Sequence, residues 1–249
     1  MTDAGSGGGT PGCGAAPAIS TGEWVTSTLD VGGATRDWAV FLPAGYDPDR
    51  RYPVVYQFHG CSDGPVRENN NVPVQRESGA DAIHVRGRAV DRCWDTSTDG
   101  PDMAFFDTMV ATIEATYCAD PGRRFATGYS SGSFMSHRLA CVRGDVLRAV
   151  ATIGGGQGGR GCSGTVAALI VHDRDDGTVN ISASEGARDA HVERNACGST
   201  RTSVDPSPCE TYDSCTPGMP VTWCETMGMG HSRQDGFAAP AFWAFLSSL

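Results

Sequence analysis

Short apolar runs recur along the chain and indicate buried β-strands. Residues 52–60 (YPVVYQFHG) and 165–173 (TVAALIVHD) are almost continuously apolar, which is typical of strands covered on both faces of a sheet. Residues 23–31 and 36–43 alternate apolar and polar positions, as half-buried strands do, and the Gly-Gly pair between them predicts a hairpin. Further strands are predicted at residues 79–87, 123–130, 147–155 and 221–227.

Segments with helical spacing of apolar residues lie between these strands. Residues 102–118 form the longest, and Asp102 is the expected N-cap. Alternation of strands and helices predicts an α/β fold in which a mostly parallel sheet carries helices on both faces. The other predicted helices cover residues 131–142, 182–197 and 240–249.

The first 18 residues differ in composition from the rest of the chain. They are rich in Gly, Ser and Pro and contain neither a charged head nor an apolar stretch, so no signal peptide is visible. We interpret residues 1–18 as a flexible leader and residues 19–249 as a single catalytic domain.

Composition narrows the class of protein. With 39% hydrophobic residues in 249, the chain can bury a sizeable core, and no apolar run reaches the about 18–20 residues that span a bilayer. The net charge is −10 and all 19 basic residues are Arg, so we expect neither nucleic acid nor an anionic membrane as partner. Without lysine, mechanisms that use a lysine base or Schiff base are excluded.

The ten cysteines are even in number and include no C-x-x-C pair. We expect several disulfides and an extracytoplasmic, oxidising compartment, with free buried thiols as the alternative. Four of the ten fall between Cys197 and Cys224, which predicts a stapled segment there, although the pairing stays open. No H-E-x-x-H motif or paired histidines occur, and we expect no metal and no cofactor.

Residues 128–132 (Gly-Tyr-Ser-Ser-Gly) match the motif G-x-S-x-G with Ser130 at its centre. The motif lies where a predicted strand ends and a predicted helix begins, which is the setting of a nucleophile elbow. Small flanking residues suit a tight turn, and the helix N-terminus favours negative charge that develops at the serine. Ser130 is therefore the candidate nucleophile. A Gly/Ser turn without chemistry is the alternative.

A serine nucleophile needs a histidine base and a carboxylate to orient it, in the chain order Ser, acid, His on this kind of fold. Asp173, Asp175 and Asp176 follow the best predicted strand. His231 lies in a glycine-rich segment before the last predicted helix and is the candidate base, whereas His191 has charged neighbours and is expected at the surface.

Two backbone N–H groups should face the oxyanion. We expect the first from Ser131, the residue after the nucleophile, and the second from Cys61 in the loop that follows residues 52–60. Gly60 would allow close approach of the backbone, and His59 is expected to be a structural hydrogen-bonding residue.

Several motifs together resemble those of a known family. The segments HGC, YCADPGRRFATGYSSGSFM, VHDRDDGTV and GMGHS are similar to those of secreted esterases grouped with polyhydroxybutyrate depolymerases and feruloyl or acetylxylan esterases. The resemblance runs from about Tyr52 to the C-terminus. It implies an α/β-hydrolase fold, a Ser-His-Asp triad, no metal, and hydrolysis of esters carried on polymers or bulky acids.

The resemblance also implies which carboxylate is the acid. The family pattern H-G-x-x-D-x-x-V, aligned on His172, puts Asp176 at the acid and leaves Asp173 where a glycine is usual. Asp173 and Asp175 stay as alternatives. Whichever carboxylates do not pair with the imidazole are expected to face solvent and to have no role.

Aromatic residues near the predicted sheet edge are candidates for substrate binding. Trp94 and Tyr129 are the two that we assign to this role, with core packing as the alternative for each. Core packing is the favoured interpretation for Phe134 and Trp223.

These features predict a secreted, monomeric serine esterase that forms an acyl-enzyme. Feruloyl or acetyl esters on polysaccharide and aliphatic or aromatic polyesters are the rival substrates. The alternative from a different class is a non-catalytic binding or cell-surface protein that retains the fold.

Overall fold

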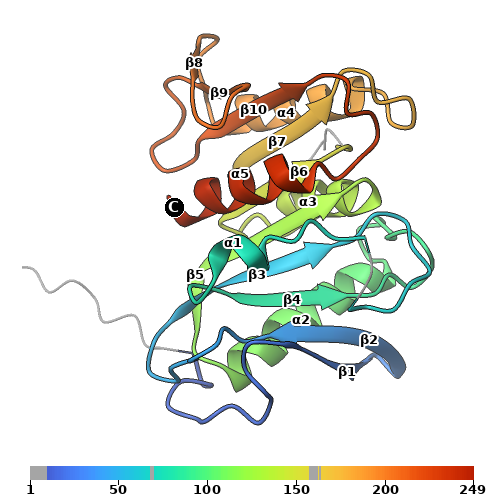
Figure 1. The fold of residues 1–249 in the computed structure, drawn as a ribbon, viewed down its shortest axis with the longest axis vertical. Helices are drawn as coiled ribbons and strands as arrows, with labels where there is room; N and C mark the ends of the chain where they lie inside the picture. The colour runs from blue at the N-terminus through green and yellow to red at the C-terminus, as the bar shows by residue number, and fades with distance from the viewer. Residues whose placement is uncertain (1–9, 68–69, 157–161, 163) are drawn as a thin grey trace, which may run out of the picture.

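The computed structural model describes residues 10–67, 70–156, 162 and 164–249. Its centre is a ten-stranded sheet with the order β1-β2-β4-β3-β5-β6-β7-β10-β9-β8 (Figure 1). The strands are β1 (Trp24–Val31), β2 (Ala34–Phe41), β3 (Tyr52–Phe58), β4 (Ile83–Gly87), β5 (Ala119–Tyr129), β6 (Ala149–Ile153), β7 (Ala167–Asp173), β8 (Arg201–Ser203), β9 (Cys209–Tyr212) and β10 (Val221–Thr226).

The middle of the sheet is parallel and its two edges are antiparallel. Strands β4, β3, β5, β6, β7 and β10 run in one direction, so their carboxyl ends meet at one edge of the sheet. β1 and β2 form the predicted hairpin, which joins β4 in antiparallel register, and β9 and β8 extend the opposite side. The predicted α/β-hydrolase fold with a mostly parallel sheet is confirmed.

Helices cover both faces of the sheet. In Figure 1, α5 (Asp235–Ser247) and the short α1 (Gln75–Ser78) lie in front of the sheet, whereas α2 (Pro101–Thr116), α3 (Ser131–Val142) and α4 (Ser182–Arg194) lie behind it. The central strands are buried at every position in β3, β4, β6 and β7, because each of them packs against helices on both sides. Two hydrophobic clusters, one on each face, form the core.

The structure differs from the sequence prediction in three respects, each for a local reason. Asp102 is not the N-cap of α2, because the helix begins at Pro101 and the Asp102 side chain is completely buried, where it binds Arg36. α5 begins at Asp235 and contains Pro240, which the apolar pattern alone placed at the start of the helix. β8, β9 and α1 are short, and their residues carry too little periodicity to be recognised.

All ten cysteines form disulfides, in agreement with the prediction. The pairs are Cys13–Cys118, Cys61–Cys93, Cys141–Cys162, Cys197–Cys215 and Cys209–Cys224. The last two staple the segment between residues 197 and 224, as expected.

The described part of the predicted leader is attached to the body of the protein. Cys13 is bound to Cys118, the Gly12 amide donates to the Glu114 carbonyl at 3.1 Å, and the Thr10 hydroxyl donates to the Tyr117 carbonyl at 2.9 Å. The flexible leader predicted over residues 1–18 therefore does not extend to residues 10–14, and residues 1–9 lie outside the described residues. Among the helices that the structure describes, none has the length and apolar character needed to cross a membrane.

Candidate active site

Ser130 lies at the turn between β5 and α3. Its backbone has φ 53° and ψ −118°, a strained conformation for a residue with a side chain. A Cβ at Gly128 would lie 2.0 Å from the Gly132 carbonyl oxygen, and one at Gly132 would lie 1.9 Å from the Phe58 carbonyl oxygen. Both glycines of G-x-S-x-G are thus required by close packing of the backbone, and the turn has the predicted strand–turn–helix form.

The structure brings together the three side chains that the sequence assigned to a triad. The Ser130 hydroxyl and His231 Nε2 are 2.9 Å apart, and His231 Nδ1 and Asp176 Oδ2 are 2.7 Å apart. The serine follows β5, the carboxylate follows β7 and the histidine follows β10, so all three lie at the carboxyl edge of the sheet. In this arrangement, the hydroxyl can give its proton to the imidazole, and the carboxylate can orient the ring.

Asp176 is held as a charged group in a nearly closed environment. Its side chain is 1% exposed, and its Oδ1 accepts the backbone N–H groups of Thr178 and Val179 at 2.8 and 2.9 Å. Burial raises the pKa of Asp176, but the hydrogen bonds from His231, Val179 and Thr178 outweigh it, so the pKa lies below its ordinary value. The carboxylate is therefore available to accept from Nδ1 near neutral pH.

The other two carboxylates do not simply face solvent, which corrects the sequence expectation. Asp173 is 1% exposed and accepts the amides of Met229 and Gly230, each at 3.0 Å. Asp175 is exposed, yet its Oδ2 accepts the Gly228 amide at 3.0 Å. The segment that carries His231 is thus anchored by Asp173 and Asp175, while Asp176 contacts the imidazole itself.

The two segments expected to supply oxyanion N–H groups lie side by side. The close contact between Gly132 and Phe58 places the start of α3 against the end of β3, from which the loop with Cys61 departs. The Ser131 hydroxyl accepts the Trp94 amide at 2.9 Å, so this hydroxyl is occupied in a structural contact. The Ser131 side chain therefore serves the fold, and only its backbone N–H is a candidate for the oxyanion.

A third segment, residues 92–94, connects these two segments. Cys93 is disulfide-bonded to Cys61, and the Arg92 carbonyl accepts the Ser62 amide at 2.8 Å. Trp94 bonds to Ser131 through its amide and donates its indole N–H to the His59 carbonyl at 2.9 Å. Residues 92–94 therefore hold both candidate oxyanion segments in one position.

Trp94 does not have the predicted substrate-binding geometry. It is 6% exposed, and its ring packs edge-on against Phe58 with centroids 5.0 Å apart and lies 4.9 Å from the His59 ring. Because the ring is enclosed by the core, it offers no face to a ligand. His59 is completely buried and bonds to the Gly60 carbonyl and the Ala89 amide, which agrees with the expected structural role.

Tyr129 is close to the site but is also buried, with 6% exposure. Its hydroxyl donates to the His231 carbonyl at 3.1 Å, and the two rings have centroids 5.2 Å apart. We therefore interpret Tyr129 as a residue that positions His231, in place of the predicted substrate contact. Trp223, at 2% exposure, belongs to the core as expected.

His191 is not a surface residue. It is 1% exposed, and its Nε2 lies 3.2 Å from Nδ1 of His137 on α3. Burial is the main cause that lowers the pKa of His191 well below its ordinary value, so the ring is neutral inside the protein. Its charged neighbours in sequence misled the prediction, because they do not keep the ring at the surface: Arg194 contacts His191 Nδ1 at 3.2 Å while the ring itself is enclosed between α4 and α3.

Two methionines near His231 escaped the sequence analysis. Among the described residues, three large hydrophobic side chains are exposed, and two of them are Met227 at 70% and Met229 at 53%. The third is Val90 at 55%. The only signal in the sequence was the position of both methionines in the glycine-rich segment that carries His231.

The chain is similar in sequence to known feruloyl esterases. Feruloyl esterase D of Neurospora crassa is 30% identical over 263 residues, which cover 95% of this chain and 89% of that protein. Feruloyl esterase C of Emericella nidulans is 29% identical and aligns with 76% of this chain and 70% of that protein. No family model matches the chain.

Solved structures show the same fold at lower sequence identity. An acetyl xylan esterase from Aspergillus awamori superposes with a TM-score of 0.71 at 16% identity, over 92% of this chain and all of the other. A CE1 ferulic acid esterase from Anaeromyces mucronatus superposes with a TM-score of 0.59 at 19% identity, over 91% of this chain and 89% of that one. The likeness to these structures concerns the fold.

Proposed function

This chain belongs to the feruloyl esterase family and is a serine carboxylic-ester hydrolase, and from that premise we propose that it hydrolyses feruloyl or acetyl esters carried on polysaccharide. Ser130 is the nucleophile, His231 the general base and acid, and Asp176 the carboxylate that orients the imidazole. The observation that carries this assignment is the continuous pair of hydrogen bonds from Ser130 through His231 to Asp176.

In the first half of the reaction, Ser130 Oγ attacks the ester carbonyl carbon while its proton passes to His231 Nε2. The resulting imidazolium donates from Nδ1 to Asp176, whose negative charge stabilises it. The tetrahedral intermediate collapses when His231 returns the proton to the alkoxy oxygen. The alcohol then leaves, and the acyl group stays bound to Ser130 as an ester.

In the second half, water attacks the acyl-enzyme with His231 as base. The proton that His231 takes from water passes to Ser130 Oγ when the second tetrahedral intermediate collapses. The products are the free carboxylic acid and the regenerated enzyme. In both halves, the backbone N–H groups of Ser131 and Cys61 are the donors that we assign to the oxyanion.

Exposed apolar surface beside His231 supports an ester with a bulky acid. Met227 and Met229 offer flexible side chains that adapt to an aromatic ring. The five disulfides support action in an oxidising compartment outside the cytoplasm, and the net charge of −10 does not favour nucleic acid as a partner. We propose that the protein acts there as a monomer.

The assignment is tested by comparing Ser130→Ala with Ser136→Ala on methyl ferulate and p-nitrophenyl acetate. Ser136 is a matched control, because it is buried on the same helix and its hydroxyl donates only to the Gly132 carbonyl, at 2.9 Å. Ser130→Ala should lower kcat by about 10⁴–10⁶-fold, and Ser136→Ala should retain most activity. Retention of activity by Ser130→Ala would refute the mechanism.

A fluorophosphonate probe distinguishes an enzyme from a protein that only keeps the fold. The probe should label the wild type at Ser130 and leave the Ser130→Ala variant unlabelled. Release of acid from methyl ferulate but not from a film of short-chain polyhydroxybutyrate would then favour polysaccharide esters over polyester, and the reverse preference would reject our choice of substrate.

A further inference from the structure

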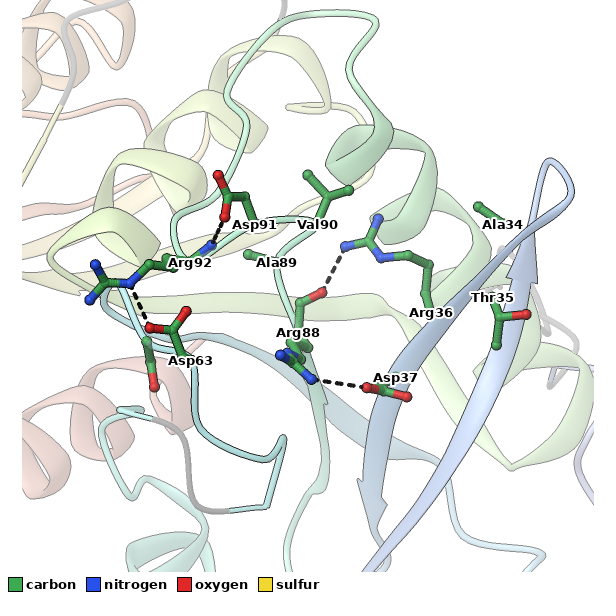
Figure 2. A pocket seen from close by; sticks show the side chains of 11 residues that line it. Ala34, Thr35, Arg36, Asp37, Asp63, Arg88, Ala89, Val90, Asp91 and Arg92 are labelled. Atoms are coloured by element: carbon green, nitrogen blue, oxygen red, sulfur yellow. Dashed lines mark hydrogen bonds and ion pairs between the residues drawn. The ribbon is translucent and has the colours of Figure 1, made fainter.

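A polar groove lies beside the loop that carries Cys61. It consists of two adjoining hollows of about 330 and 430 Å³ that share Asp37, Asp63 and Arg88, and Figure 2 shows the first of them. Volumes of this size are typical of small-molecule binding sites. We call these two hollows the β2 groove. Its lining also includes Arg36, Ser62, Val90, Asp91 and Arg92.

The β2 groove opens at the same edge of the sheet as Ser130. Arg88 directly follows β4, and Asp37 on β2 lies opposite that end in the antiparallel register. In the strand order, β2 is separated from β5 by β4 and β3, which corresponds to about 14 Å at the usual strand spacing. Ser62, in the groove wall, is the neighbour of Cys61. A polymer bound at the triad could therefore extend into the groove.

Most of the charges in the groove form ion pairs. Arg88 and Asp37 lie 3.4 Å apart, and Arg92 and Asp63 lie 2.7 Å apart, as the dashed lines in Figure 2 mark. These two pairs carry no net charge, and Arg36 is neutralised by Asp102, whereas Asp91 adds one further carboxylate, so the groove does not favour an anion. Their N–H groups and carboxylate oxygens nevertheless offer donors and acceptors to a neutral ligand.

The floor of the groove is rigid. Arg36 forms a buried ion pair with Asp102 and donates to the Arg88 carbonyl at 2.7 Å. Asp102 also accepts the amide of Val90 at 3.2 Å. A groove whose backbone is already fixed requires little ordering when a ligand binds, which favours binding of a weakly interacting polar molecule.

We infer that the β2 groove is a subsite for the polysaccharide that carries the ester. This inference rests on the proposed function and adds the residues that bind the sugar chain. A sugar unit has hydroxyl groups that both donate and accept, which suits the alternating Arg and Asp side chains. It also has an apolar C–H face, for which the exposed Val90 side chain provides a contact. A neutral sugar chain therefore matches the groove better than an anionic ligand.

The test compares two substrates that differ in the alcohol part. Asp37→Ala combined with Arg88→Ala removes one charge of each sign, so the net charge of the protein is unchanged. This double variant should lower kcat/KM on a feruloylated arabinoxylo-oligosaccharide by about tenfold, a loss that corresponds to one or two hydrogen bonds. On methyl ferulate, which has a methyl group in place of the sugar, kcat/KM should change by less than about twofold.

The exposed Arg50–Asp81 pair provides a matched control. It lies at the amino ends of β3 and β4, at the opposite edge of the sheet from the β2 groove, and its atoms are 2.7 Å apart. Arg50→Ala combined with Asp81→Ala should leave both substrates unaffected, and both double variants should unfold at similar temperatures. An equal loss on both substrates, or no loss on the oligosaccharide, would overturn the inference.

A binding measurement separates this inference from the proposed catalytic mechanism. Ser130→Ala protein should bind an unesterified arabinoxylo-oligosaccharide in isothermal titration, and addition of the groove substitutions should weaken the affinity by about tenfold. If methyl ferulate is not hydrolysed at all, the proposed function fails while the titration still reports on the groove. If hydrolysis is normal and the oligosaccharide does not bind, the groove proposal alone fails.

Discussion

Asp173 does not touch the His231 ring, yet it fixes the segment on which that ring is carried. Its two carboxylate oxygens accept the amides of Met229 and Gly230, and the Thr226 hydroxyl donates to it at 2.9 Å. Burial raises the pKa of Asp173, but these hydrogen bonds outweigh it and the pKa lies below its ordinary value. The carboxylate at the end of β7 therefore works as the anchor of the loop after β10.

Replacement of each of the three carboxylates by its amide should lower kcat to a different extent. Asp176→Asn should lower kcat by about ten-thousandfold, because the imidazole loses its orienting acceptor. Asp173→Asn should cost about a hundredfold through displacement of His231, since an amide N–H would face the loop N–H groups. Asp175→Asn should stay within about threefold, because its single bond is exposed. Steady-state kinetics on p-nitrophenyl acetate would measure the order, and an equal effect at Asp173 and Asp175 would contradict the anchoring role.

The Cys61–Cys93 disulfide should matter for catalysis as well as for stability. Without it, the loop that carries the Cys61 amide loses its covalent link to residues 92–94 and keeps only non-covalent contacts, such as the hydrogen bond from the Ser62 amide to the Arg92 carbonyl, so the oxyanion donor is less well placed. Cys61→Ser with Cys93→Ser should lower kcat about tenfold or more. Cys197→Ser with Cys215→Ser is the control, because this pair lies between α4 and the end of β9.

In each of the two double variants, the free energy of unfolding should be lower by about 2–4 kcal/mol. The two effects are separated by measuring kcat and the unfolding midpoint on the same preparations. If the second pair of substitutions reduced kcat as much as the first, the positioning role of residues 92–94 would be wrong.

The exposed methionines should influence the choice of acyl group. Met227→Ala with Met229→Ala removes apolar surface beside His231, so kcat/KM on methyl ferulate should fall about three- to tenfold. The smaller acyl group of p-nitrophenyl acetate should be affected much less. Val90→Ala is a matched control, because it truncates the third exposed apolar side chain, which lines the β2 groove and not the segment that carries His231. Equal losses on both esters would argue against an acyl-binding surface.

Buried histidines should make the protein less stable in mild acid. Burial lowers the pKa of His84 and of His137 to about 3. In the unfolded chain, each ring has a pKa near its ordinary value of about 6.5. Between pH 6.5 and 3, the unfolded state therefore binds protons that the folded state does not. The free energy of unfolding should fall as the pH drops through this interval, by about 1.4 kcal/mol per pH unit for each such histidine.

Urea unfolding at pH 7, 6 and 5 with intact disulfides would measure this slope. His137→Gln should reduce the slope of the free energy of unfolding against pH by the contribution of one histidine. Glutamine can still bond to the Thr152 hydroxyl, but it does not titrate. The depressed pKa values of Asp173 and Asp176 add a further loss only below about pH 4, where these groups become protonated in the unfolded chain. A constant stability from pH 7 to pH 5 would contradict the prediction.

The sequence by itself determined the features that depend on neighbouring residues. Continuous apolar runs identified the central strands because a strand covered by helices on both faces cannot contain many polar side chains. The two glycines around Ser130 identified the strained turn because any side chain there would collide with backbone. The chain order of serine, aspartate and histidine then placed all three at the same edge of the sheet, since they follow parallel strands.

Only the tertiary structure decided how side chains from distant segments meet. Three adjacent carboxylates have the same local setting, and they differ only in which atoms of the loop after β10 they contact. The sequence around Trp94 fits a ligand surface and the core equally well, and only the fold places its indole N–H against the His59 carbonyl. In the same way, only the packing of α4 on α3 buries His191. Contacts between segments that are far apart in sequence depend on the whole fold, and no local pattern encodes them.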